Sequence, residues 1–78
     1  MEKAIEAFMG HDSYGRHIHA AVREDGQWFS RHWGFNGYGN GWLKWKKDQE
    51  LPRLEDGRVE WGFKTLEPIN PEGLRLPN

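Results

Sequence analysis

Three histidines are the sharpest candidates for chemistry in this 78-residue chain. His17 and His19 are two residues apart, so in a β-strand both side chains point to one face. A hairpin turn at Asp25-Gly26 places His32 directly opposite His19. Three imidazoles on one face are a geometry that binds zinc or iron. The preceding loop holds two candidates for a fourth ligand, His11 and Asp12. The alternative is a solvated or interface histidine cluster; we expect this alternative, and no cofactor.

Aromatic and basic residues are mixed over residues 32–47, HWGFNGYGNGWLKWKK. Exposed rings beside cations can stack on nucleobases while the cations meet phosphates. They can also form a hot spot in a protein interface, or the lysine stems can simply shield the indoles. Strand alternation over 41–47 predicts Trp42 on one side with the lysines, opposite Trp45. The partner-binding face predicted from these patterns consists of Arg23, Trp28, Tyr38, Trp42, Lys44 and Lys46.

Other reaction chemistries find no support in the sequence. There is no cysteine, so thiolate catalysis, thiolate metal sites and disulfides are excluded. The glycine-rich loop over 34–41 lacks the Gly-Lys-Ser/Thr ending of a phosphate-binding loop. Ser13 and Ser30 lack the context of a nucleophilic serine. We therefore expect a protein that is not an enzyme.

The elements that would position these residues are short strands separated by turn signals. Asp25-Gly26 predicts a two-residue hairpin turn that pairs Val22 with Phe29 and Ile18 with Trp33. Asp56-Gly57 predicts a second hairpin, with Leu54 opposite Val59. Two further strands are expected over 41–47 and 58–66. Residues 2–9 fit a helix or a strand, and a strand is favoured because a hairpin-like loop follows.

These elements predict an all-β fold, a small antiparallel meander of four to five strands that is strongly twisted or barrel-like. Residues 1–66 are expected to form a single β domain and residues 67–78 an irregular C-terminal arm, since the latter hold three prolines. Aromatic residues would supply much of the small core. The predicted core consists of Ile18, Val22, Phe29, Trp33, Trp45, Trp61 and Phe63.

The net charge of −1 argues against a general polyanion binder, yet residues 10–47 carry six Lys/Arg and three Asp/Glu. No apolar run is long enough to cross a membrane, and we expect a cytoplasmic protein. The expected function is non-catalytic docking on a larger protein or protein–nucleic acid complex through the aromatic and basic face. Phages and mobile elements encode small inhibitors of host machinery of this general type. The alternatives are a single-stranded nucleic-acid-binding module and a small metalloprotein that uses the three histidines.

Overall fold

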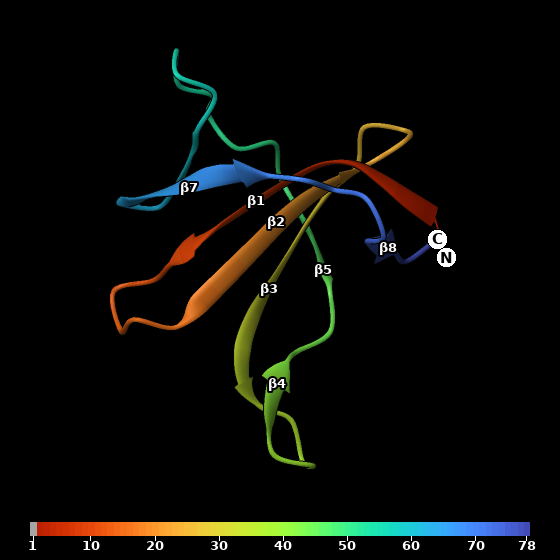
Figure 1. The fold of residues 1–78 in the computed structure, drawn as a ribbon, viewed down its shortest axis with the longest axis vertical. Coiled ribbons are helices and arrows are strands. Elements are labelled where there is room, and N and C mark those ends of the chain that lie inside the picture. Colours follow the sequence, from red (N-terminus) through yellow and green to blue (C-terminus); the bar gives the residue numbers. More distant parts are fainter. Residues whose placement is uncertain (1) are drawn as a thin grey trace.

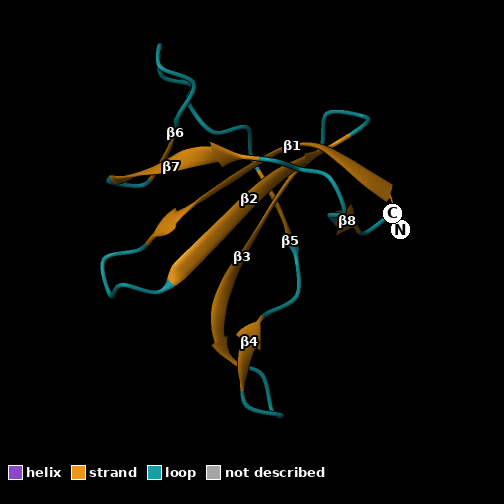
Figure 2. Cartoon of the chain, in the orientation of Figure 1, coloured by secondary structure: helices purple, strands orange, loops and turns teal. Residues whose placement is uncertain are grey.

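The computed structural model describes residues 2–78, which form eight strands and no helix (Figures 1 and 2). The sheet is antiparallel throughout, with the order β4-β3-β2-β1-β7-β6, while β5 also pairs with β3 and β8 with β1. The all-β prediction is confirmed, and the sheet is a twisted, open one. The strands are β1 (Glu2–His11), β2 (His17–Arg23), β3 (Trp28–Phe35), β4 (Asn40–Trp42), β5 (Lys46–Asp48), β6 (Val59–Trp61), β7 (Lys64–Ile69) and β8 (Arg75–Leu76).

The turns at the two Asp-Gly pairs and at Gly15 share one construction. In the β2–β3 turn the Arg23 amide donates to the Gln27 carbonyl, and the Gly26 amide donates back to the Arg23 carbonyl. Each turn encloses three residues, the last a glycine with φ of +79° to +91°. A two-residue type I′ turn needs positive φ at both central residues. Within residues 2–78 only glycines have positive φ, so each predicted hairpin exists with one extra loop residue.

This extra residue shifts the predicted strand register by one. Val22 pairs with Trp28 and Ile18 with His32, so the predicted pairings with Phe29 and Trp33 are wrong. A shift of one residue moves every side chain to the other face of the sheet. The second hairpin is shifted in the same way, since Val59 pairs with Arg53 and not with Leu54.

Both faces of the sheet are covered, and each has its own core. On the first face the core is completed by the segment from 51 to 61; on the second it is completed by the C-terminal segment, in which β8 pairs with the start of β1. The first core contains Phe8, Ile18, Ala20, Val22, Trp28, Val59 and Leu66, with Leu51 and Trp61 packed against it. The second core contains Ala4, Ala7, Ala21, Phe29 and Leu76, with Trp45, Ile69 and Leu74 packed against it.

The predicted core is only partly correct. Ile18, Val22 and Phe29 are buried. Trp61 is partly buried against the first core and Trp45 against the second. Trp33 is 39% exposed and Phe63 fully exposed, so these two assignments are wrong. Phe63 is exposed because it lies in the turn between β6 and β7, which divides the strand predicted over 58–66. The N-terminal segment is a strand, β1, as favoured from the sequence.

Candidate functional site

A β-bulge between β4 and β5, which follow one another along the same edge of β3, organises the candidate site. β4 and β5 both run antiparallel to β3, with Trp42 opposite Trp33 and Lys46 opposite Ser30. Between these pairs, two residues of β3 face three residues of the outer strand, 43–45. The extra residue reverses the alternation of side chains. Trp42 and Trp45 therefore stand together on the second face, while Lys46 lies on the first, and the predicted grouping of Trp42 with Lys46 is wrong.

The two tryptophans hold an arginine and a histidine between them on the second face. The Arg31 guanidinium carbon lies 4.7 Å from the centroid of the Trp42 ring and 4.2 Å from that of Trp45. The His19 ring stacks on Trp42 with centroids 4.4 Å apart and an interplanar angle of 12°. Arg31 Nε donates to His19 Nδ1 at 3.2 Å. We call these four residues the Arg31 cluster; the stacking and the hydrogen bond fix the orientation of the guanidinium.

His19 is an uncharged member of this cluster at neutral pH. It is 5% exposed, and burial, followed by the charge of Arg31, lowers its pKa from 6.5 to about 4. Because Nδ1 accepts from Arg31, the ring proton resides on Nε2. Nε2 is buried and has no hydrogen-bond partner within residues 2–78. The imidazole therefore accepts from the Arg31 guanidinium through Nδ1 and does not neutralise its charge.

Arg31 differs from the two other partly buried arginines, Arg23 and Arg58, in having no carboxylate partner among the described residues. Within residues 2–78 four arginines pair with carboxylates: Arg16 with Asp12, Arg23 with Asp25, Arg53 with Glu6, and Arg58 with Asp56. Arg31 is half-buried, its pKa is lowered by burial, and it forms no ion pair with any carboxylate of residues 2–78. The segment 26–47 that contains it has four Lys/Arg and no Asp/Glu. The cluster therefore presents an uncompensated positive charge.

An apolar hollow adjoins the cluster on the same face. Met9, His17, Trp33 and Trp42 line about 420 Å³ of open space, which we call the aromatic hollow. The rings of Trp33 and Trp42 stand at 85° to each other with centroids 5.4 Å apart. A second hollow of about 540 Å³ shares Met9 and His17 and continues over β1 and β7 as far as Lys64. The two hollows thus form one path across the sheet.

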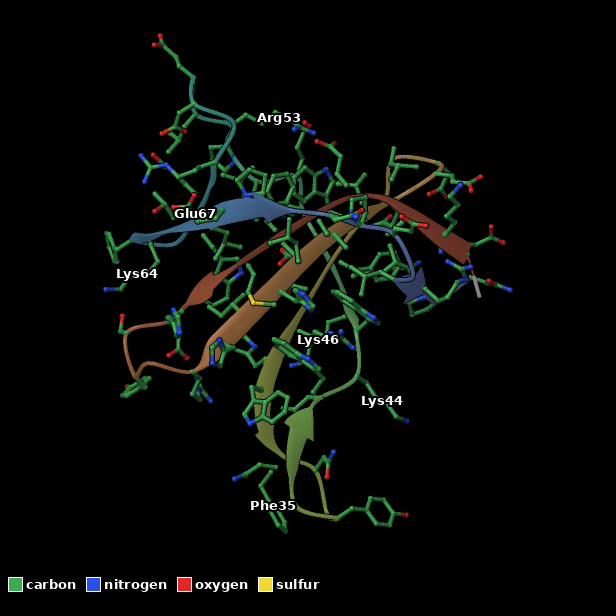
Figure 3. The ribbon with its side chains drawn as sticks, in the orientation of Figure 1. Phe35, Lys44, Lys46, Arg53, Lys64 and Glu67 are labelled. Carbon is green, nitrogen blue, oxygen red and sulfur yellow. The ribbon has the colours of Figure 1, made fainter. Side chains whose placement is uncertain are left out.

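The β3–β4 hairpin extends this face away from the body of the protein (Figures 1 and 3). Phe35 is 75% exposed near its tip, and Tyr38 is fully exposed, as predicted. Gly37, with φ of +94°, lets the chain reverse in two residues, closed by a hydrogen bond from the Asn36 amide to the Gly39 carbonyl. The hairpin therefore presents two aromatic rings to solvent.

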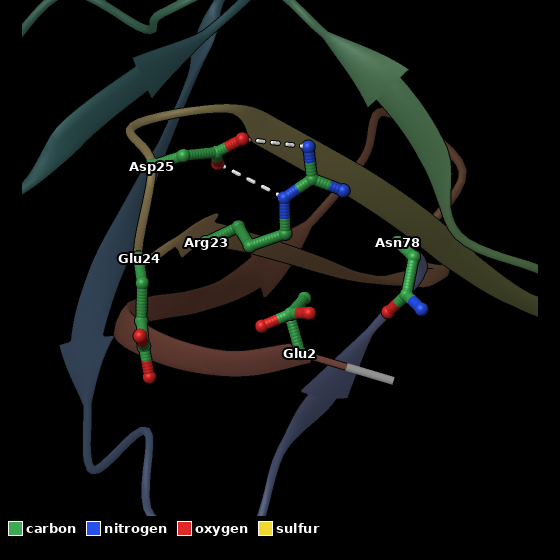
Figure 4. Close-up of a pocket in the computed structure, with 5 residues that line it drawn as sticks. All are labelled: Glu2, Arg23, Glu24, Asp25 and Asn78. Carbon is green, nitrogen blue, oxygen red and sulfur yellow. Dashed lines mark hydrogen bonds and ion pairs between the residues drawn. The ribbon is translucent and has the colours of Figure 1, made fainter.

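The other predicted partner-binding residues take different positions. Trp28 is 5% exposed and stacks on Phe8 in the first core, so its predicted exposure is wrong. Arg23 binds the Asp25 carboxylate and the Pro77 carbonyl oxygen, which anchors the C-terminal segment beside a hollow also lined by Glu2 (Figure 4). Lys44 and Lys46 are exposed, and Lys44 extends outward from the edge of the sheet (Figure 3).

The structure does not bring together the three histidines of the alternative metalloprotein hypothesis, His17, His19 and His32. His32 lies on the first face, with its ring centroid 5.2 Å from that of Trp61 and the two rings at 72°, whereas His17 and His19 lie on the second. The register shift separates them. His17 instead neighbours His11, with ring centroids 4.4 Å apart. Within residues 2–78 no group of three or more His, Asp or Glu side chains is arranged to hold a metal ion.

No protein-family model, curated protein or solved structure matches the chain. The described part of the chain contains no long apolar helix of the kind that crosses a membrane. The residues that sequence reasoning missed are Arg31, Trp33 and Phe35; the signal that could have found Arg31 is the lack of any Asp or Glu over 26–47.

Proposed function

We propose that the protein is a non-catalytic binding module that docks on a larger macromolecule through the Arg31 cluster, the aromatic hollow and the β3–β4 tip. We call these together the docking face. The observation that carries the proposal is the half-buried Arg31 guanidinium, held between two indoles without a carboxylate partner. Burying an unpaired charge costs free energy, and an anionic group of a partner would offset that cost.

The composition of the docking face supports binding in preference to catalysis. Tryptophan, tyrosine and arginine are the residue types that dominate interface hot spots. Stacking already restricts the Arg31 side chain, so less conformational entropy is lost when a partner binds. The described residues of the face offer no nucleophile beside a general base, which acyl or phosphoryl transfer would need. We further propose action in the cytoplasm by occupying a partner's surface, as small phage-type inhibitors do.

The test is a capture experiment with paired variants. The parent, Trp33→Ala and Phe63→Ala proteins are immobilised and exposed to cell lysate, with and without nuclease treatment. Trp33 lines the aromatic hollow, whereas Phe63 is an exposed aromatic ring elsewhere, in the turn between β6 and β7. We expect a partner that the parent and Phe63→Ala retain and Trp33→Ala loses. An identical captured set for the parent and Trp33→Ala would contradict the proposal.

A further inference from the structure

We infer that the partner of the docking face is a single-stranded nucleic acid, one base of which enters the aromatic hollow while a neighbouring phosphate meets Arg31. This inference rests on the proposed function and names the chemical class of the partner. It depends on three features of the second face: the flat walls of the hollow, the distribution of charge, and the path that leaves the hollow.

The walls of the aromatic hollow suit a flat ring. Trp33 and Trp42 stand nearly perpendicular, so a ring stacked on one indole meets the edge or face of the other. Met9 and His17 complete the lining, and no carboxylate of residues 2–78 takes part in it. Nucleobases stack on exposed aromatic side chains with little dependence on sequence, because every base has a π-face.

The charge of the docking face calls for an anion. Segment 26–47 carries four Lys/Arg and no Asp/Glu, a charge of +4; the rest of the chain holds seven of the 11 cations and all 12 carboxylates, a charge of −5. Lys46 lies on the first face, which leaves Arg31, Lys44 and Lys47 for the second face and the sheet edge. Within the described part of the chain, the Arg31 side chain is hydrogen-bonded only to His19 Nδ1, which leaves N–H donors for a phosphate. Each nucleotide supplies a flat ring and a negative charge together, whereas an acidic peptide supplies mainly the charge.

The path across the sheet suits a single strand of nucleic acid and excludes a duplex. From the aromatic hollow it continues past Met9 and His17 to Lys64 on β7, along a stretch that Asp12 and Glu67, paired with Arg16 and Arg58, also line. On the other side the hairpin tip carries Phe35 and Tyr38. Bases of a duplex are stacked on one another and must leave the helix before they can reach such a hollow. A single strand offers unstacked bases without that cost.

The test uses a fluorescein-labelled oligothymidylate of about 15 nucleotides, within the size range of single-strand sites. Fluorescence anisotropy gives its affinity for the parent between about 50 and 200 mM salt. If Arg31, Lys44 and Lys47 neutralise phosphates, log K falls with log salt with a slope of about −2, or about −3 if Lys64 on the path also does. We expect a slope of about −2 to −3 and weaker binding of the corresponding duplex.

The variants separate stacking from charge. Trp33→Ala should weaken oligothymidylate binding by about 5- to 150-fold, the range for one lost base–aromatic stack. Phe63→Ala should bind as the parent does, and Lys44→Ala should reduce the salt slope by about 0.7. If Trp33→Ala has a lower melting temperature than the parent, the inference is tested by Lys44→Ala alone, and an unchanged salt slope in that variant would contradict it.

Three results would overturn the inference: no binding of the oligothymidylate at about 50 mM salt, undiminished binding by a folded Trp33→Ala, or tighter binding of polyglutamate than of the oligonucleotide. The last would assign the face to an acidic protein. If the oligonucleotide fails but nuclease-treated lysate still yields a protein that Trp33→Ala loses, the docking proposal stands and only the nucleic-acid inference fails.

Discussion

The Arg31 guanidinium carbon lies 4.2 Å from the centroid of Trp45, three residues beyond Trp42, whose ring it also contacts at 4.7 Å. In a regular strand two residues three apart point to opposite faces. The bulge over 43–45 removes this restriction, so both indoles flank one cation from β3. An irregularity of a single residue thus creates the cluster on which the proposed function depends.

The first prediction concerns the pH dependence of stability. The pKa of His19 is about 4 in the folded protein and close to 6.5 when unfolded. Between these values the unfolded chain binds a proton that the folded protein does not, so stability is fully present above pH 6.5 and falls as the pH drops to 4. At about 1.4 kcal/mol per pKa unit, the free energy of unfolding falls by roughly 3 kcal/mol. Urea unfolding at several pH values in this window measures it.

The variant His19→Gln tests whether His19 causes this loss. It removes the titrating group while keeping a polar side chain that can accept from Arg31, so the pH dependence between 4 and 6.5 should become shallower. His17→Gln makes the same change at an exposed position on the same strand and controls for the substitution itself. Equal pH dependence in the parent and in His19→Gln would show that another group is responsible.

The second prediction contrasts a buried and an exposed tryptophan. Trp28 is 5% exposed and stacks on Phe8, so Trp28→Ala should lower the free energy of unfolding by about 3–5 kcal/mol. Trp33 is 39% exposed and belongs to neither core, so Trp33→Ala should cost markedly less. Urea midpoints at pH 7 compare the two. If Trp33→Ala were the more damaging change, the assignment of faces would be incorrect.

The turns could be predicted from the sequence, but the register could not. Asp-Gly fits both a two-residue and a three-residue hairpin loop, since only the glycine must take positive φ in the latter. Hydrophobic alternation does not choose between the two registers, because both faces are covered. One register places Phe29 with Val22 and the other places Trp28 with it, and the folded protein buries both aromatic residues.

The candidate site was less predictable than the fold. The bulge contains Leu43 and Lys44 and no glycine or proline that would mark it in the sequence. The alternation of a regular strand therefore predicts Trp42 and Trp45 on opposite faces. The predicted grouping of the three histidines is wrong for the same reason as the predicted register, since the shift of one residue places His32 on the other face. The lack of a partner for Arg31 depends on which carboxylates approach it, and this is decided by tertiary packing.

The third prediction concerns a close approach between β1 and β7. A Cβ added at Gly10 would lie 2.6 Å from Leu66 Cδ2 and 2.8 Å from the Thr65 carbonyl oxygen. The backbone oxygen cannot move without separating the strands, so Gly10→Ala should cost about 1–3 kcal/mol. Gly34→Ala is the matched control, because its Cβ would meet Leu43 at an ordinary 3.7 Å. Thermal melts of the two variants check this; equal melting temperatures would contradict it.

The last prediction concerns the coupling of Arg31 and His19, whose side chains are hydrogen-bonded at 3.2 Å. Arg31→Met should lower the free energy of unfolding by about 1–3 kcal/mol, because it leaves the buried Nδ1 of His19 without a donor. His19→Phe should also destabilise, because it removes the acceptor of the guanidinium. Replacing both partners by apolar groups of similar size removes the unsatisfied atoms together. The double variant should therefore lose less stability than the two single variants added together.

Urea unfolding of the parent, both single variants and the double variant measures this coupling, which we expect at about 0.5–3 kcal/mol. Binding separates the structural role of the pair from the functional one. The double variant should stay folded yet bind oligothymidylate as weakly as Arg31→Met, because the phosphate loses its cation in both. Additivity within about 0.5 kcal/mol would mean that the two residues stabilise the fold independently. Parent-like binding by the folded double variant would remove Arg31 from the docking face.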